Sequence, residues 1–301
     1  MPTKQELIDQ SSYGYIPTNW VCIIFIVLFS ITGLLHILQA IRFKYWIAFP
    51  TLVVGCFLEV LGSIGRYWSS QNVLARTPFL MQICVLIIAP VFFSAWCYTI
   101  LALAINVLGR SYSFVSPKLY LAIFITCDFI SLILQAVGGG WVASSDAPIP
   151  PKTPTNIMVV GIVFQLVSML IFCSLALDFM LRAWNNKPWP HRVRALATSP
   201  VDTQDSLQSK EEALNNSATN SVAAHEEVKG WWWVMTGVAL CSLMIIIRGL
   251  YRSVELVQGW NGYLITHQVY QDTLDAVPMF LALVFINVFH PGFFLPKRSK
   301  W

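Results

Sequence analysis

Long apolar runs separated by short polar connections dominate the pattern of the chain. Each run has about 20 residues or more, the length that a helix needs to cross about 30 Å of hydrocarbon. The pattern therefore predicts an all-α, polytopic membrane protein with seven transmembrane helices. The predicted spans are 20–41, 46–67, 79–106, 119–141, 156–181, 231–252 and 269–290.

The polar segments divide the chain further. We expect 1–19 to form an extracellular tail, 20–182 to hold the first five helices, and 231–290 to hold the last two. Residues 183–230 are rich in Ser, Asn, Gln, Asp and Glu and are too poor in apolar side chains to build a core. They predict a disordered cytoplasmic loop. Residues 291–301 form a basic tail.

Basic residues are distributed unevenly between the two sides that these spans define. Cytoplasmic loops of membrane proteins carry an excess of Lys and Arg. We therefore predict that the N-terminus is outside and the C-terminus is cytoplasmic. The richer side carries Arg42, Lys44, Arg110, Lys118, the basic residues of 183–230, Lys297, Arg298 and Lys300.

The composition narrows the class of protein. Charged residues make up 11% of the chain, whereas a soluble domain has about 25%, so an ordinary soluble protein is excluded. The net charge of +4 is spread between the apolar runs, which excludes a nucleic-acid partner. The cysteines form no CxxC pair and the chain has no GxxxxGK[ST] motif. We expect no metal, nucleotide or other cofactor.

Several ionisable residues lie inside the apolar runs. Each costs about 2.5–3.5 kcal/mol in hydrocarbon, so such side chains face the bundle interior and commonly have a function. Their depths converge on the outer half of the membrane, which predicts an outward-facing polar cavity. Gln82 and Gln165 add amides to the outer half, and Gln135 lies further out than Asp128 on the same span. The ionisable residues are Glu59, Arg66, Asp128, Arg248, Arg252, Glu255 and Asp275.

A purely structural role is the alternative for this group. The four acids and three arginines could pair as internal struts, which would leave one acid unmatched. Buried polar contacts between membrane helices average only about 0.6 kcal/mol, so struts hold a bundle inefficiently. The sequence leaves both interpretations open.

Four different motifs follow one another along the chain. They are Gly14-Tyr15-Ile16-Pro17; Glu59-x-x-Gly62-x-x-Gly65-Arg66; Asp128-x-x-Ser131-x-x-x-Gln135; and Arg248-x-x-Tyr251-Arg252-x-x-Glu255, followed by His267, Tyr270 and Asp275. This set resembles the fungal lipid-translocating exporter family, whose founding members confer resistance to aminocholesterol. The resemblance covers nearly the whole chain except 183–230.

The resemblance implies a seven-span membrane protein without ATPase activity. Relatives are linked to sphingoid long-chain base export, toxicant resistance and porphyrin transport. One position departs from the family pattern, because Gln268 stands where a Glu is expected. If that Glu binds a proton or a cationic head group in relatives, the neutral amide alters the substrate here.

We therefore predict a non-enzymatic, ATP-independent protein of the plasma membrane that translocates a membrane lipid or another hydrophobic amphiphile. A head with a positive amine would suit the surplus acid, which makes sphingoid bases the first candidates. The sequence specifies no protein partner and no catalytic or metal-binding residue. The predicted substrate-binding residues are Glu59, Arg66, Gln82, Asp128, Gln135, Arg248, Arg252, Glu255, Gln268, Tyr270 and Asp275.

Two other classes of function remain as alternatives. One is a seven-span sensor that signals through 183–230 and the C-terminal tail. It would not belong to the G-protein-coupled class, because the acid–Arg pair and the Asn-Pro-x-x-Tyr motif of those receptors are absent. The other is an intramembrane enzyme that uses an Asp or Glu as a general acid.

Overall fold

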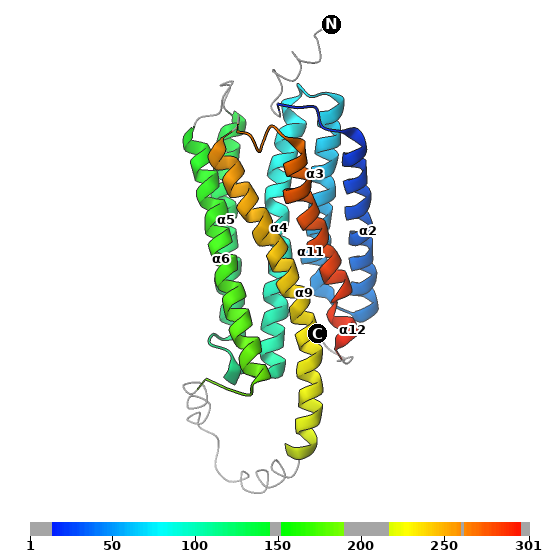
Figure 1. The fold of residues 1–301 in the computed structure, drawn as a ribbon, viewed down its shortest axis with the longest axis vertical. Coiled ribbons are helices and arrows are strands. Elements are labelled where there is room, and N and C mark those ends of the chain that lie inside the picture. The colour runs from blue at the N-terminus through cyan, green and yellow to red at the C-terminus, as the bar shows by residue number, and fades with distance from the viewer. Residues whose placement is uncertain (1–13, 145–151, 190–216, 260–261, 296–301) are drawn as a thin grey trace.

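A computed structural model describes residues 14–144, 152–189, 217–259 and 262–295. Within these residues the chain is helical and has no strand. Seven helical segments are long and apolar enough to cross a membrane, which confirms the predicted number of spans. They run along one common direction (Figure 1).

The helices follow the apolar runs closely. The first five spans are α2 (Asn19–Phe43), α3 (Val54–Gln71) with the short turns Trp46–Ala48 and Phe49–Val53 before it, α4 (Arg76–Leu108), α5 (Pro117–Ser144) and α6 (Lys152–Trp184). The last two are α9 (Ser217–Gln258) and the segment made of α10 (Gln268–Gln271), the π-helical turn η4 (Asp272–Ala276) and α11 (Val277–Val288). A short helix, α12 (Pro291–Phe294), follows.

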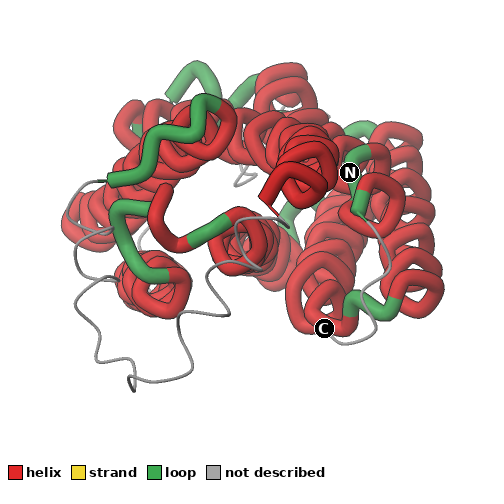
Figure 2. The backbone as a smooth tube through the Cα atoms, turned by 90° about the horizontal axis from the view of Figure 1, so that it is seen from below, coloured by secondary structure: helices red, strands yellow, loops and turns green. Residues whose placement is uncertain are grey.

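The order of the helices across the bundle places α9 in the middle. The pair α5 and α6 forms one edge, α2 and α3 form the other, and α4, α9 and α11 lie between them (Figure 1). The end-on view shows the helices grouped around the middle ones, with the connections at the bundle ends (Figure 2). Helices α4, α6 and α11 therefore all pack against α9.

Small residues let two pairs of helices approach closely. A Cβ at Gly65 of α3 would lie 3.2 Å from the backbone of α4, and one at Gly161 of α6 would lie 3.0 Å from the Ser131 carbonyl oxygen of α5. Close backbone approach through small residues is the usual basis of helix packing in membranes.

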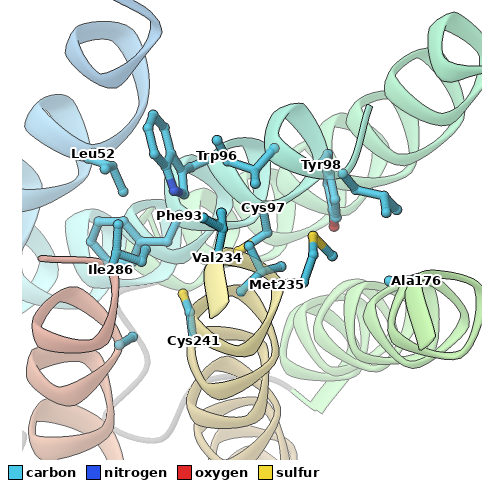
Figure 3. Packing of buried hydrophobic residues seen from close by; sticks show 14 of the residues in the cluster. Leu52, Phe93, Trp96, Cys97, Tyr98, Ala176, Val234, Met235, Cys241 and Ile286 are labelled. Carbon is cyan, nitrogen blue, oxygen red and sulfur yellow. The ribbon is translucent and has the colours of Figure 1, made fainter. Parts of the chain in front are cut away.

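The apolar core fills the half of the bundle away from the N-terminus. Trp96 and Tyr98 of α4 belong there to one buried apolar cluster with Met235 and Cys241 of α9 (Figure 3). Many large apolar side chains point outward instead, such as Leu38, which is 62% exposed. An apolar outer surface around an apolar core is expected where the surrounding solvent is lipid.

The boundaries of 183–230 differ from the sequence expectation at both ends. Helix α9 begins at Ser217, in a stretch that contains the good helix formers Ala, Glu and Lys. At the other end, the Arg182 guanidinium stacks 3.7 Å from the centre of the Trp189 ring. Residues 190–216 lie outside the described part of the chain. The predicted tail 291–301 begins with α12, where the His290 ring accepts a hydrogen bond from the Gly292 N–H at 3.1 Å.

Candidate functional site

A buried group of charged side chains joins three helices near the end of the bundle that carries the N-terminus. Arg248 of α9 contacts Glu59 of α3 (Nη1 to Oε1, 3.0 Å) and Asp275 of η4 (Nε to Oδ1, 2.7 Å). Both acids are almost fully buried, and Glu59 is only 1% exposed. Arg248 therefore bridges two carboxylates from helices far apart in the sequence.

A proline in α4 supplies a further acceptor for the same arginine. Pro90 has no backbone N–H, so the carbonyl of Leu86, four residues earlier, lacks its normal helical donor. Arg248 Nη2 donates to this oxygen at 2.6 Å. The guanidinium thus satisfies a backbone group that the proline frees inside the membrane.

One helical turn further along α9, Arg252 completes the group. It pairs with Asp275 and, at 2.9 Å, with Glu255. The Tyr251 hydroxyl donates to Glu255 Oε1 at 2.9 Å. We call this group the ionic cluster; its members are Glu59, Arg248, Arg252, Glu255 and Asp275.

A second layer covers the ionic cluster toward the N-terminal end. Arg66 pairs with Asp272 at 3.0 Å and donates to the Tyr15 hydroxyl at 3.2 Å. Tyr15 in turn donates to Gln271 Oε1 at 2.8 Å. Burial raises the pKa of Tyr15 to about 12 against the opposing effect of Arg66, so the hydroxyl keeps its proton at neutral pH and can donate. The π-helical turn η4 directs both Asp272 and Asp275 toward arginines.

Gln268 closes this second layer. Its Oε1 accepts hydrogen bonds from the backbone N–H of Thr18 at 3.1 Å and from the Thr18 hydroxyl at 2.9 Å. Its amide nitrogen donates to Asp272 Oδ2 at 2.9 Å. The amide that departs from the family pattern therefore acts as a donor to a carboxylate.

Asp128 of α5 lies apart from the ionic cluster. It is 1% exposed, and neither carboxylate oxygen makes a hydrogen bond within the described part of the protein, although the Tyr98 hydroxyl lies near it. Further along α5, Gln135 Nε2 donates to Ser131 Oγ at 2.6 Å and to Gln165 Oε1 of α6 at 3.2 Å. If the predicted acids and arginines pair as internal struts, one acid is left without a partner; in the structure, Asp128 is the predicted acid that forms no ion pair.

The cavities against the ionic cluster are small. One of about 20 Å³ lies beside Glu59, Arg66 and Asp275, and one of about 40 Å³ lies beside Arg248 and Arg252. A cavity needs about 10–15 Å³ to hold one water molecule, so these have room for one to a few waters. Neither matches the predicted outward-facing polar cavity in size. The structure holds the charged residues in the paired arrangement that the sequence had left as its alternative.

The structure brings most of the predicted site residues together but not all. Gln82 is buried on α4, where it faces the close approach of α3 at Gly65. Gln135 lies on α5 beside Gln165. Tyr270 is not in the cluster; it is half-buried and packs with Tyr263 at a ring-centre distance of 5.6 Å.

Five residues of the two layers were not predicted as site residues: Tyr15, Thr18, Tyr251, Gln271 and Asp272. Asp272 lies three residues before Asp275 in the same span, a spacing that places both acids on one face of a helix. Tyr15 and Tyr251 belong to the quoted motifs, so the motifs contained a signal that the charges alone did not. Their roles follow from contacts between distant parts of the chain.

The fold and the buried charges define a multi-pass membrane protein with an ion-paired interior. The chain belongs to the RTA1-like protein family, whose model matches residues 52–298. No solved structure matches the chain significantly.

Curated relatives come from Saccharomyces cerevisiae. The chain is 36% identical over 290 residues to the sphingoid long-chain base transporter RSB1, which covers 95% of this chain and 75% of that protein. It is 28% identical over 241 residues to protein RTM1, covering 79% of this chain and 66% of the relative. It is 26% identical over 242 residues to protoporphyrin uptake protein 1, covering 80% and 68%. Two of these three relatives are named for transport or uptake.

Proposed function

We propose that this chain translocates an amphiphile with an amine-bearing head, such as a sphingoid long-chain base, between the leaflets of the plasma membrane. The similarity to a sphingoid long-chain base transporter along 95% of the chain carries the proposal. The N-terminus lies outside, so the ionic cluster lies toward the exoplasmic leaflet. The protein moves its substrate without chemical conversion and therefore is not an enzyme.

The charges favour a cationic head. Four carboxylates in the two layers face three guanidinium groups, a formal excess of one negative charge. Asp128 adds one further acid without an opposite charge. A protonated amine would compensate this excess. The arginines are Arg66, Arg248 and Arg252, and the acids are Glu59, Glu255, Asp272 and Asp275.

The head group binds at the two small cavities beside the ionic cluster, which predicted site residues line. Because these cavities have room for only a few waters, the paired arrangement is a closed state, and the ion pairs must part to admit a head group. An amine can replace an arginine as the partner of Glu255 or Asp275, so no carboxylate is left uncompensated in hydrocarbon. Gln135 and Gln82 offer amides for hydroxyl groups.

Transport does not use a bound nucleotide, because the sequence lacks a P-loop motif. A substrate gradient or an ion gradient then drives net movement. This predicts that purified protein alone, in vesicles without ATP, moves the substrate down its gradient.

The direct test is reconstitution into vesicles with a fluorescent sphingoid base in the inner leaflet. We expect the base to reach the outer leaflet faster than in empty vesicles, without ATP. Glu255→Gln should slow transport at least tenfold, because it weakens the contact with Arg252 and removes a carboxylate available to the amine. Asp178→Asn is the matched control: its ion pair with Arg182 is 38% exposed on the acid side, and we expect wild-type rates.

Three outcomes would contradict the proposal. Wild-type vesicles that move the base no faster than empty ones would exclude translocation. A chemically altered base recovered from the vesicles would indicate an intramembrane enzyme. Loss of a cellular response after deletion of 200–225, in a protein whose vesicles move no base, would indicate a sensor; the structure describes only 217–225 of that segment.

A further inference from the structure

Besides the two small cavities at the ionic cluster, the structure contains a larger cavity that the charged residues do not line. It has a volume of about 320 Å³ and lies between α6 and α9, in the half of the bundle away from the ionic cluster. Its lining is almost entirely apolar and includes Phe172 and Ala176 from α6 and Met235 and Ala239 from α9. Figure 3 shows Ala176 and Met235 on these two neighbouring helices.

Two hydroxyl groups on α9 also line this cavity. Thr236 donates to the Trp232 carbonyl at 2.9 Å and is therefore satisfied within the helix. The Ser242 hydroxyl is fully buried and makes no hydrogen bond within the described part of the protein. Neither hydroxyl is therefore available to a ligand, and the cavity presents an apolar surface that excludes water.

The apolar cavity and the 40 Å³ cavity beside Arg248 both lie against α6 and α9. Ile246 lines both, and the 40 Å³ cavity beyond it is lined by Gln135, Gln165, Arg248 and Arg252. From Trp232 to Arg252 the path along α9 measures about 30 Å at the rise of an α-helix. Its polarity changes from apolar at one end to amide and guanidinium at the other.

We infer that the groove between α6 and α9, from Trp232 to Ile246, binds the hydrocarbon chain of a single-chain amphiphile whose polar end lies against Gln135 and Gln165. This inference rests on the proposed function and names the site of the substrate's tail. An apolar cavity of about 150 Å³ holds a benzene molecule, so 320 Å³ accommodates roughly a dozen carbons of one chain. A second helix, about 10 Å across, is too wide to fit.

The position of this groove relative to the charges has a mechanistic meaning. A lipid at rest keeps its head at the membrane surface and its chain within its own leaflet. Here the polar end lies below the second layer of charges and the chain extends into the opposite half of the bundle. An amphiphile in the groove would therefore have its head and its chain at depths between those of a lipid in the outer leaflet and a lipid in the inner leaflet.

The test uses a sphingoid base with a photoreactive diazirine at the end of its chain, in vesicles that contain the full chain. In the wild-type protein we expect cross-links on α9 between 235 and 243 and on α6 between 172 and 180. Ala239→Phe should reduce labelling and transport at least tenfold, because Ala239 is exposed in the groove and a phenyl ring there fills it without displacing packed neighbours. Ala122→Phe, on the exposed face of α5, should change neither.

A chain-length series in the wild-type protein gives a second readout that does not depend on a variant. Unlabelled bases with chains of about twelve carbons or more should displace the probe, and much shorter chains should not. Competition that ignores chain length would overturn the inference.

Other results separate the groove from the proposed function. If Ala239→Phe transports and labels like the wild type, the groove is not the tail site, while transport itself stands. If a two-chain phosphatidylcholine with the same diazirine labels these residues equally, the groove holds only surrounding lipid and the inference is wrong. If the wild type labels in the groove but does not transport, the proposed function fails and the binding site stands.

Discussion

Two buried aspartates, Asp275 and Asp128, have nearly the same exposure and opposite surroundings. Asp275 contacts both Arg248 and Arg252, whereas neither oxygen of Asp128 has a hydrogen-bond donor in the described part of the protein. An ionised Asp275 is compensated by two guanidinium groups, but an ionised Asp128 would have no opposite charge beside it, only the Tyr98 hydroxyl nearby. The comparison separates an acid that forms ion pairs between helices from a buried acid that forms none.

The largest expected effect on stability is at Asp275, the aspartate that forms ion pairs. Asp275→Asn would leave Arg248 and Arg252 short of a carboxylate and should lower the free energy of unfolding by about 3–5 kcal/mol, because uncompensated buried charges are costly. Thermal unfolding in detergent measures the change. Asp178→Asn, which removes a half-exposed pair, should cost less than about 1 kcal/mol. A variant Asp275→Asn as stable as Asp178→Asn would show that the ionic cluster does not hold the bundle.

A smaller effect is expected in the second layer. Gln268→Glu would replace the amide that donates to Asp272 with a second carboxylate, and should cost about 1–3 kcal/mol at neutral pH. Lowering the pH should restore stability, because a proton shared by the two carboxyl groups replaces the lost donor. Thermal unfolding across a pH series tests this.

Gln258→Glu is the matched control for that substitution. Gln258 accepts a hydrogen bond from the Leu264 N–H at an exposed position, and a glutamate keeps the acceptor. We expect unchanged stability at every pH. Equal pH dependence in both variants would show that the contact between Gln268 and Asp272 is not the cause.

The smallest effect on stability is expected at Asp128. Asp128→Asn removes no hydrogen bond of the described residues and no ion pair, so the unfolding temperature should stay the same or rise slightly. The same variant should slow transport of an amine-bearing base if Asp128 receives the head group. A loss of stability comparable to that of Asp275→Asn would mean that Asp128 has a compensating partner, and the contrast between the two acids would disappear.

The sequence predicted the spans well because their signal is local. A run of about 20 apolar residues can satisfy its backbone in hydrocarbon only as a helix, so length and composition suffice. The start of α9 at Ser217 was missed because the stretch before Trp231 is polar, and polarity was interpreted as absence of structure.

The pairing of the charges was much harder to predict. Glu59 and Arg248 are far apart in the sequence, and their contact depends on the order of α3, α4, α9 and α11 across the bundle. Spacing along one helix predicts which residues lie on the same face, but it does not predict which other helix that face contacts. The same limit hid Asp272, whose partner Arg66 lies on a different helix, α3.

The bond from Arg248 to the Leu86 carbonyl has a consequence for motion. Pro90 cannot return a donor to that carbonyl, so the oxygen stands bare in hydrocarbon whenever the arginine swings away. A bare backbone oxygen there costs several kcal/mol. Arg248 can therefore leave the Leu86 carbonyl without this cost only when a hydroxyl, an amine or a water molecule takes its place as the donor, so any movement of the arginine depends on a replacement donor.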